Sequence, residues 1–157
     1  MNDETMTTTL TIDAPASAVF DVLADPTQHP AIDGTGWLDK AVDPVPLTAA
    51  GQVFRMDMYH ENHPDKHYRM SNKVEVLDPP RAIGWMPGQP GPDGELQFGG
   101  WTWHYDLVPT GPTTTDVTLT YDWSHVPPQV REFIQFPPFP PAHLSNSLQH
   151  LAQLATA

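Results

Sequence analysis

Two alternating stretches joined by a turn decide the fold: Trp101-Thr-Trp-His-Tyr-Asp-Leu107 and Val117-Thr-Leu-Thr-Tyr-Asp-Trp123. In each stretch every second residue is apolar or aromatic, and the residues between them are Thr, His or Asp. Period-two alternation is typical of a strand that buries one face. The intervening Pro109-Thr-Gly-Pro-Thr-Thr-Thr115 is rich in turn-forming residues. The sequence therefore predicts an antiparallel hairpin.

The predicted buried face of this hairpin is strongly aromatic. Five of its eight residues are Trp or Tyr, namely Trp101, Trp103, Tyr105, Tyr121 and Trp123. These side chains are bulky, and each carries a polar tip that needs a hydrogen-bond partner when it is buried. Some of them must belong to the core, because protein interiors are packed without large voids. The same face could also line a ligand cavity, and the sequence leaves both interpretations open.

The remaining segments predict an α+β protein. Strands are expected at 7–12, 53–60, 67–77 and 82–86, with a short edge strand at 37–42 and a loop at 87–94. Two short helices follow the first strand, one from Ser17 to the Asp25-Pro26 break and one over 27–32. A long C-terminal helix is indicated by Leu144, Leu148, Leu151 and Ala155, which share one helical face. We expect a curved antiparallel sheet of about six to seven strands, wrapped around this helix.

The composition limits the classes of function. A length of 157 residues is most simply one domain, 1–157. The 7 Lys and Arg against 19 Asp and Glu give a formal charge of −12, which disfavours nucleic acids and anionic membrane surfaces. The absence of cysteine excludes thiol catalysis and disulfides. No signal-peptide pattern or membrane-length apolar run is present, so we expect a cytoplasmic protein, a monomer or a homodimer, without membrane insertion.

Several segments together resemble one known family. Leu10–Pro26 contains a strand, an Ala-Pro break and a short helix, and Val74–Arg81 contains a strand-to-strand turn. Trp103–Thr110 followed by Val117–Tyr121 is similar to the family's penultimate hairpin, and the C-terminal amphipathic helix completes the pattern. On these segments the chain resembles the START-related SRPBCC superfamily, the polyketide cyclase/dehydrase and lipid-transport group. The resemblance implies a helix-grip fold with a cavity for an apolar ligand between the sheet and the last helix.

The resemblance also places a set of residues near that cavity. The expected ligand-binding residues are Trp37, Met58, Tyr68, Trp85, Trp103, Tyr105, Tyr121, Phe136, Phe139, Ser147 and Leu148. The segment 133–141, with Phe133, Phe136 and Phe139, is an insertion relative to many relatives. In the family this region lies near the cavity mouth, so its phenylalanines are either a lid or a plug of the core.

His60 and Asn72 are polar residues on otherwise apolar strand faces. Each either satisfies a neighbouring backbone group or contacts a ligand, because buried polar groups need partners. His60, Asn72, Tyr105 and Tyr121 are the candidates for catalysis. His143 and Ser147, one helical turn apart, either face the cavity or face solvent.

Other kinds of site find little support in the sequence. The histidines and carboxylates of 60–67 suit an exposed turn better than a metal site, because their spacing matches no helical ligand pair. No nucleophile elbow is present, and Pro90 and Pro92 interrupt the glycine-rich loop at 88–94, which excludes a phosphate cradle. We therefore expect neither a metal nor a cofactor.

Three functions remain open at this stage. The first is the binding of a small hydrophobic or aromatic molecule, such as a lipid, a polyketide or a related metabolite. The second is a polyketide cyclase, aromatase or dehydrase-type enzyme that uses the same cavity. The third is a protein-interaction module whose acidic surface selects basic partners.

Overall fold

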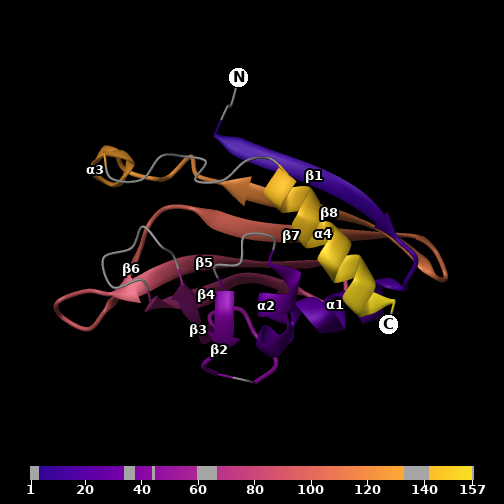
Figure 1. Ribbon diagram of the computed structural model, residues 1–157, viewed down its shortest axis with the longest axis horizontal. Coiled ribbons are helices and arrows are strands. Elements are labelled where there is room, and N and C mark those ends of the chain that lie inside the picture. Colours follow the sequence, from indigo (N-terminus) through magenta and orange to yellow (C-terminus); the bar gives the residue numbers. More distant parts are fainter. Residues whose placement is uncertain (1–3, 34–37, 44, 60–66, 133–141, 157) are drawn as a thin grey trace.

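The computed structural model describes residues 4–33, 38–43, 45–59, 67–132 and 142–156 (Figure 1). The strands are β1 (Thr5–Ile12), β2 (Leu38–Ala41), β3 (Val53–Tyr59), β4 (His67–Asp78), β5 (Ala82–Pro90), β6 (Leu96–Phe98), β7 (Thr102–Gly111) and β8 (Thr114–Asp122). The helices are α1 (Ala16–Leu23), the 3-10 turn η1 (Pro26–Gln28), α2 (His29–Ile32), α3 (Pro128–Arg131) and α4 (Ala142–Ala155).

All the strands belong to one antiparallel sheet in the order β1-β8-β7-β5-β4-β3-β2, and the short β6 pairs with the end of β5. Helix α4 crosses one face of this curved sheet, and its C-terminal half lies beside α1 (Figure 1). Helix α2 contacts both α4 and β2. The predicted helix-grip architecture, with two short helices after the first strand, is therefore confirmed.

The hairpin that decides the fold has the register expected from its alternation. Trp103 is directly opposite Tyr121, and Tyr105 is directly opposite Leu119. The two strands continue further than the turn residues suggest, since Gly111 still pairs with Thr114. The polar positions of the same strands lie on the opposite face, where Thr9 and Thr118 share a hydrogen bond of 2.9 Å between their hydroxyls.

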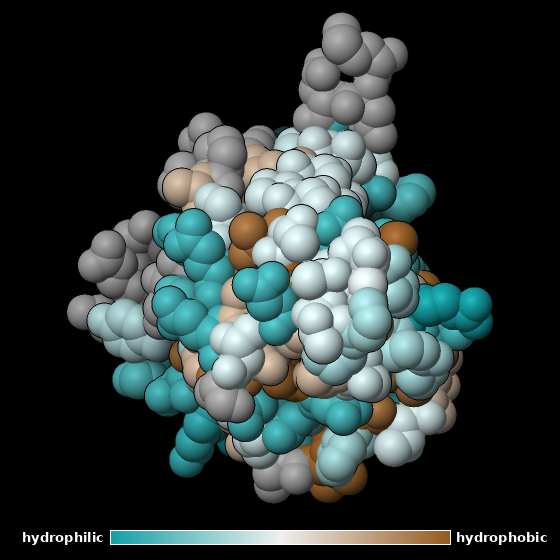
Figure 2. Space-filling model, turned by 90° about the vertical axis from the view of Figure 1, so that its right-hand side faces the viewer, coloured by the Kyte–Doolittle hydropathy of each residue, from teal (hydrophilic) through white to brown (hydrophobic). Residues whose placement is uncertain are grey.

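The core lies between this sheet and α4. Leu144, Leu148 and Leu151 have no exposed surface and pack in a cluster that contains Val19 and Leu119. The side of the molecule shown in Figure 2 is covered mainly by hydrophilic and intermediate residues, with hydrophobic side chains in small separate areas. No helix among the described residues is long and apolar enough to cross a membrane.

Two local features differ from expectation. Strand β5 extends to Pro90 instead of ending at Met86, because Gly88 to Pro90 pair with Phe98 to Leu96 on β6. This pairing occupies part of the stretch expected to be a loop. A one-turn helix, α3, follows β8 at a position where the sequence showed only proline-rich chain.

Leu148→Ala tests how far the fold depends on the α4 core. We expect the free energy of unfolding to fall by about 2–5 kcal/mol, because truncating a fully buried Leu loses apolar burial and leaves a cavity. Urea denaturation followed by circular dichroism measures the change. The exposed neighbour Gln149→Ala is the control, with an expected effect within about 0.5 kcal/mol. Equal effects of the two substitutions would contradict the proposed role of α4.

Candidate functional site

An aromatic wall lines the sheet face that looks toward α4. We use this name for Trp85, Trp103, Tyr105 and Tyr121, which lie on the adjacent strands β5, β7 and β8. The ring centres of Trp103 and Tyr121 are 4.6 Å apart, and those of Trp85 and Tyr105 are 5.9 Å apart. Tyr105 and Tyr121 are buried, whereas Trp85 and Trp103 are partly exposed. The wall therefore extends from the core toward the surface.

Tyr105 and Ser147 join the wall to α4. Both side chains are only 4% exposed, and a hydrogen bond connects them. The pKa of the Tyr105 phenol is raised to about 12, mainly by burial. The hydrogen bond with Ser147 lowers the pKa by less than burial raises it, and the negative charge of Asp33 adds a smaller rise. The phenol is therefore protonated at neutral pH, and it can donate or accept a hydrogen bond.

His143 and Ser147 face the protein interior. Both are buried, and they lie one helical turn apart on the same face of α4. The His143 ring contacts Trp103 edge-on, with 5.7 Å between the ring centres. The solvent-facing orientation that the sequence left open for this pair is therefore wrong, and a position facing a ligand cavity stays a prediction. Two polar residues on the buried side of α4 thus meet the aromatic wall.

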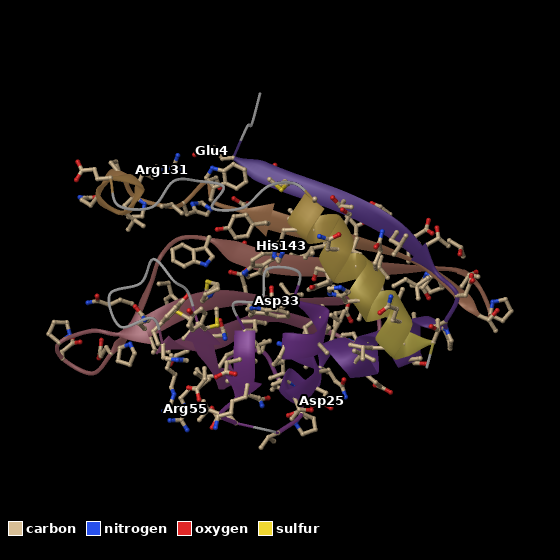
Figure 3. The ribbon with its side chains drawn as sticks, in the orientation of Figure 1. Glu4, Asp25, Asp33, Arg55, Arg131 and His143 are labelled. Carbon is tan, nitrogen blue, oxygen red and sulfur yellow. The ribbon has the colours of Figure 1, made fainter. Side chains whose placement is uncertain are left out.

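Asp33 is a site residue that the sequence did not indicate. It follows the last residue of α2, and its carboxylate Oδ2 accepts a hydrogen bond of 3.1 Å from the backbone N–H of Leu38. Figure 3 shows Asp33 and His143 in the middle of the molecule, on segments that are far apart in the chain. The negative charge of Asp33 also raises the pKa of Tyr68 on β4, after the larger effect of burial. No local pattern could have revealed this position, since it depends on how α2 docks.

Asn72 has a structural partner. Its side-chain nitrogen donates a hydrogen bond of 3.4 Å to the backbone carbonyl of Phe54, so the backbone-satisfying interpretation applies to this residue.

Met58 and Tyr68 are direct cross-strand partners and are both partly exposed. Leu148 is fully buried in the hydrophobic core.

The remaining candidates cannot be placed. Trp37, His60, Phe136 and Phe139 lie outside the described residues, as does the whole segment 133–141. Their predicted roles, including the alternatives of lid and core plug, stay predictions.

A second buried histidine, His29, was also missed by the sequence analysis. Its Nε2 lies 2.7 Å from the backbone carbonyl oxygen of Leu23, and its ring stacks on Trp85 with 5.0 Å between centres. Phe54 contacts the same ring edge-on at 5.4 Å. Burial lowers the pKa of His29, because desolvation disfavours the imidazolium. His29 thus packs against Trp85 of the aromatic wall as a neutral ring.

The described residues contain no group of three or more His, Asp or Glu side chains that could hold a metal ion. Most of the His60–His67 turn lies outside the described residues, so the structure leaves that part of the metal prediction untested.

Comparison with curated sequences finds similarity to proteins that are named as uncharacterized. No family model matches the chain. The uncharacterized protein Rv0088 of Mycobacterium tuberculosis is 28% identical over 123 residues, which cover 78% of this chain and 49% of that protein. The chain thus spans about half the length of the curated relatives it matches.

Comparison with solved structures shows the fold. Protein CV1439 from Chromobacterium violaceum superposes with a TM-score of 0.67 at 15% identity, covering 99% of each chain. Norcoclaurine synthase from Thalictrum flavum, in complex with dopamine and hydroxybenzaldehyde, gives 0.62 at 16% identity over 97% of this chain and 86% of the synthase. The KanY protein gives 0.64 at 16% identity over 100% of both chains. At identities of 15–16%, these similarities concern the fold alone.

The burial of His29 predicts how the free energy of unfolding depends on pH. Its pKa is lowered in the folded state, so the unfolded state binds the proton more readily. The contribution of His29 to the free energy of unfolding is therefore complete above about pH 6.5, where the ring is neutral in both states. As the pH falls below that value, the free energy of unfolding decreases by at most about 1.4 kcal/mol per pH unit. Urea denaturation at several pH values between about 5 and 8 measures the loss.

His29→Gln keeps a hydrogen-bond donor for the Leu23 carbonyl but does not titrate. We expect this variant to have a flatter stability profile over the same pH range, and Gln149→Ala, which changes no titratable group, to keep the slope of the unmodified protein. Identical slopes for the unmodified protein and His29→Gln would show that His29 contributes nothing to the pH dependence.

Proposed function

We propose that the chain is a ligand-binding domain of the START-related superfamily that holds a small, largely apolar or aromatic molecule between the sheet and α4. One observation carries this proposal. The His143 ring of α4 contacts the half-buried Trp103 of β7, and one turn further along α4 Ser147 bonds Tyr105 of the same strand. Apolar surface with a few oriented polar groups is the usual composition of a small-molecule site.

The two parts of the site would contribute differently to binding. Contact with Trp85 and Trp103 removes apolar ligand surface from water, which stabilises the complex by about 25 cal/mol per Å². The hydroxyl groups of Tyr105 and Ser147 would orient the ligand, because they are already placed by their mutual hydrogen bond. Such preorganisation lowers the entropic cost of association.

One structural neighbour supports the size and chemistry of the proposed ligand. Norcoclaurine synthase was solved with dopamine and hydroxybenzaldehyde, which are small aromatic molecules, so a protein with this fold accommodates ligands of that kind. A lipid or a polyketide belongs to the same broad class of largely apolar ligand.

The second candidate is an enzyme of the cyclase, aromatase or dehydrase type. The observation that favours it is a buried, protonated phenol, Tyr105, which bonds Ser147 and whose pKa is raised by burial and by the charge of Asp33. A preorganised donor in a poorly hydrated site can stabilise an oxyanion that develops on a carbonyl oxygen. Tyr105 is therefore the first candidate for a catalytic residue, ahead of Tyr121, whose pKa burial also raises.

Trp103→Ala tests the binding proposal with naphthylethanol, a neutral aromatic probe. We expect the dissociation constant measured by isothermal titration calorimetry to rise about five- to thirtyfold, because the substitution removes a large part of the apolar contact. Phe98→Ala, at an exposed aromatic residue on β6, is the control and should change the constant less than twofold. Absence of saturable binding to the unmodified protein, or equal effects of the two substitutions, would overturn the proposal.

Tyr105→Phe separates binding from catalysis. If the chain is an enzyme, the substitution removes the phenol donor, so kcat for cyclisation of a small aromatic substrate should fall about 100-fold or more. KM should stay within about threefold, because the ring still fills the same space. The matched control is Tyr59→Phe, at an exposed position on β3. Unchanged kcat in Tyr105→Phe would remove Tyr105 from any catalytic role.

A further inference from the structure

Three contacts fix the position of Asp33 at the junction of α2, β2 and α4. Its backbone N–H donates to the carbonyl of His29 at 3.0 Å. Its carboxylate accepts the N–H of Leu38 at 3.1 Å, and its own carbonyl oxygen lies 3.2 Å from Nδ1 of His150. Two of these contacts hold the backbone of Asp33 and the third orients its carboxylate, so the group has a defined direction before a ligand binds, as preorganisation requires.

The same contacts place Asp33 close to Tyr105. Ser147 and His150 are three residues apart on α4, so they lie on one face of the helix about 5 Å apart along its axis. Ser147 bonds Tyr105, and His150 contacts the backbone of Asp33. Asp33 therefore contacts α4 about one helical turn beyond Ser147, the residue bonded to the Tyr105 phenol.

Tyr68 reaches the same region from the sheet. Leu38, whose N–H binds the Asp33 carboxylate, is directly opposite Met58, and Met58 is directly opposite Tyr68. Adjacent strands are about 4.8 Å apart, so this row brings the Tyr68 ring within reach of the carboxylate. The effect of the Asp33 charge on both Tyr68 and Tyr105 agrees with this arrangement.

The Lys and Arg side chains that the structure describes lie elsewhere. Lys66 is outside the described residues, and the other six of the seven Lys and Arg residues are exposed. On β3 and β4, for example, Arg55 and Arg69 alternate with the inward residues and pair with Asp43 and Asp57. The described part of the face toward α4 thus offers an anionic ligand no Lys or Arg side chain.

We propose that the ligand is an organic cation, an ammonium group carried on an aromatic or apolar body, and that Asp33 binds its positive charge; this inference rests on the proposed function. A carboxylate forms strong charge-assisted hydrogen bonds with ammonium groups, and aromatic faces such as those of Tyr68 and Tyr105 attract cations. The net charge of −12 also raises the local concentration of cations around the protein. Fatty acids and other anionic ligands are disfavoured for the same reasons.

Three matched probes test this proposal on the unmodified protein: naphthylethylamine, naphthylethanol and naphthylpropanoate. They share one aromatic body and differ in charge. By isothermal titration calorimetry near pH 7, we expect the amine to bind about tenfold or more tightly than the alcohol, and the carboxylate to bind more weakly than either.

Asp33→Asn identifies the residue responsible. The amide keeps an acceptor for the Leu38 N–H but removes the charge, so the preference for amine over alcohol should fall below about twofold while alcohol affinity stays nearly unchanged. Asp25→Asn is the control, because Asp25 caps η1 with a similar side-chain bond to Thr27 and carries the same charge. This control should retain the full preference, which excludes a general effect of net charge.

The outcomes separate the inference from the function on which it rests. If the alcohol binds and the amine binds no better, the cation inference is wrong and the binding proposal stands. If Asp33→Asn and Asp25→Asn both keep the preference, Asp33 is not the recognition group. If none of the three probes binds, the proposed function itself fails. Should Asp33→Asn not fold, the ranking of the three probes on the unmodified protein still decides whether the ligand is a cation.

Discussion

The packing of α4 against the curved sheet is the constraint on which the rest of this structure depends. Leu144, Leu148 and Leu151 are completely buried, and they can be buried only if the sheet curls around one side of the helix. The same helix carries Ser147 between these leucines, so burying the leucine stripe also brings a polar group against the aromatic wall. Stability and the candidate site thus arise from one interface.

Burial of polar groups in this interface is stabilised by specific partners. Asn72 bonds the carbonyl of Phe54, His29 lies against the carbonyl of Leu23, and Thr115 donates to the carbonyl of Ala14 at 2.8 Å. These bonds fix the backbone around the core, as expected for buried polar groups. The Tyr105–Ser147 pair differs from them, because it joins two side chains beside half-buried aromatic rings. That difference makes it the centre of the proposed site.

The proposed ligand chemistry follows from where charge lies in this fold. The described Lys and Arg side chains are all exposed, while the negative charge of Asp33, which follows α2, raises the pKa values of Tyr68 and Tyr105. An acidic protein whose interior face combines a carboxylate with aromatic rings is complementary to cations rather than to anions. The fold alone could not have indicated this, since a shared fold accommodates ligands of different charge.

The sequence by itself determined the inward faces of the hairpin and of α4, because these depend on local periodicity. Trp103, Tyr105 and Tyr121 alternate along strands, and Leu144, Leu148 and Leu151 recur at helical spacing, so backbone geometry alone orients them. Only the tertiary structure decided which polar groups meet. Asp33 and His29 belong to short helical turns without a pattern, and their neighbours on β2, β5 and α4 are distant in the chain. Those contacts depend on sheet curvature and helix docking, which no local sequence signal encodes.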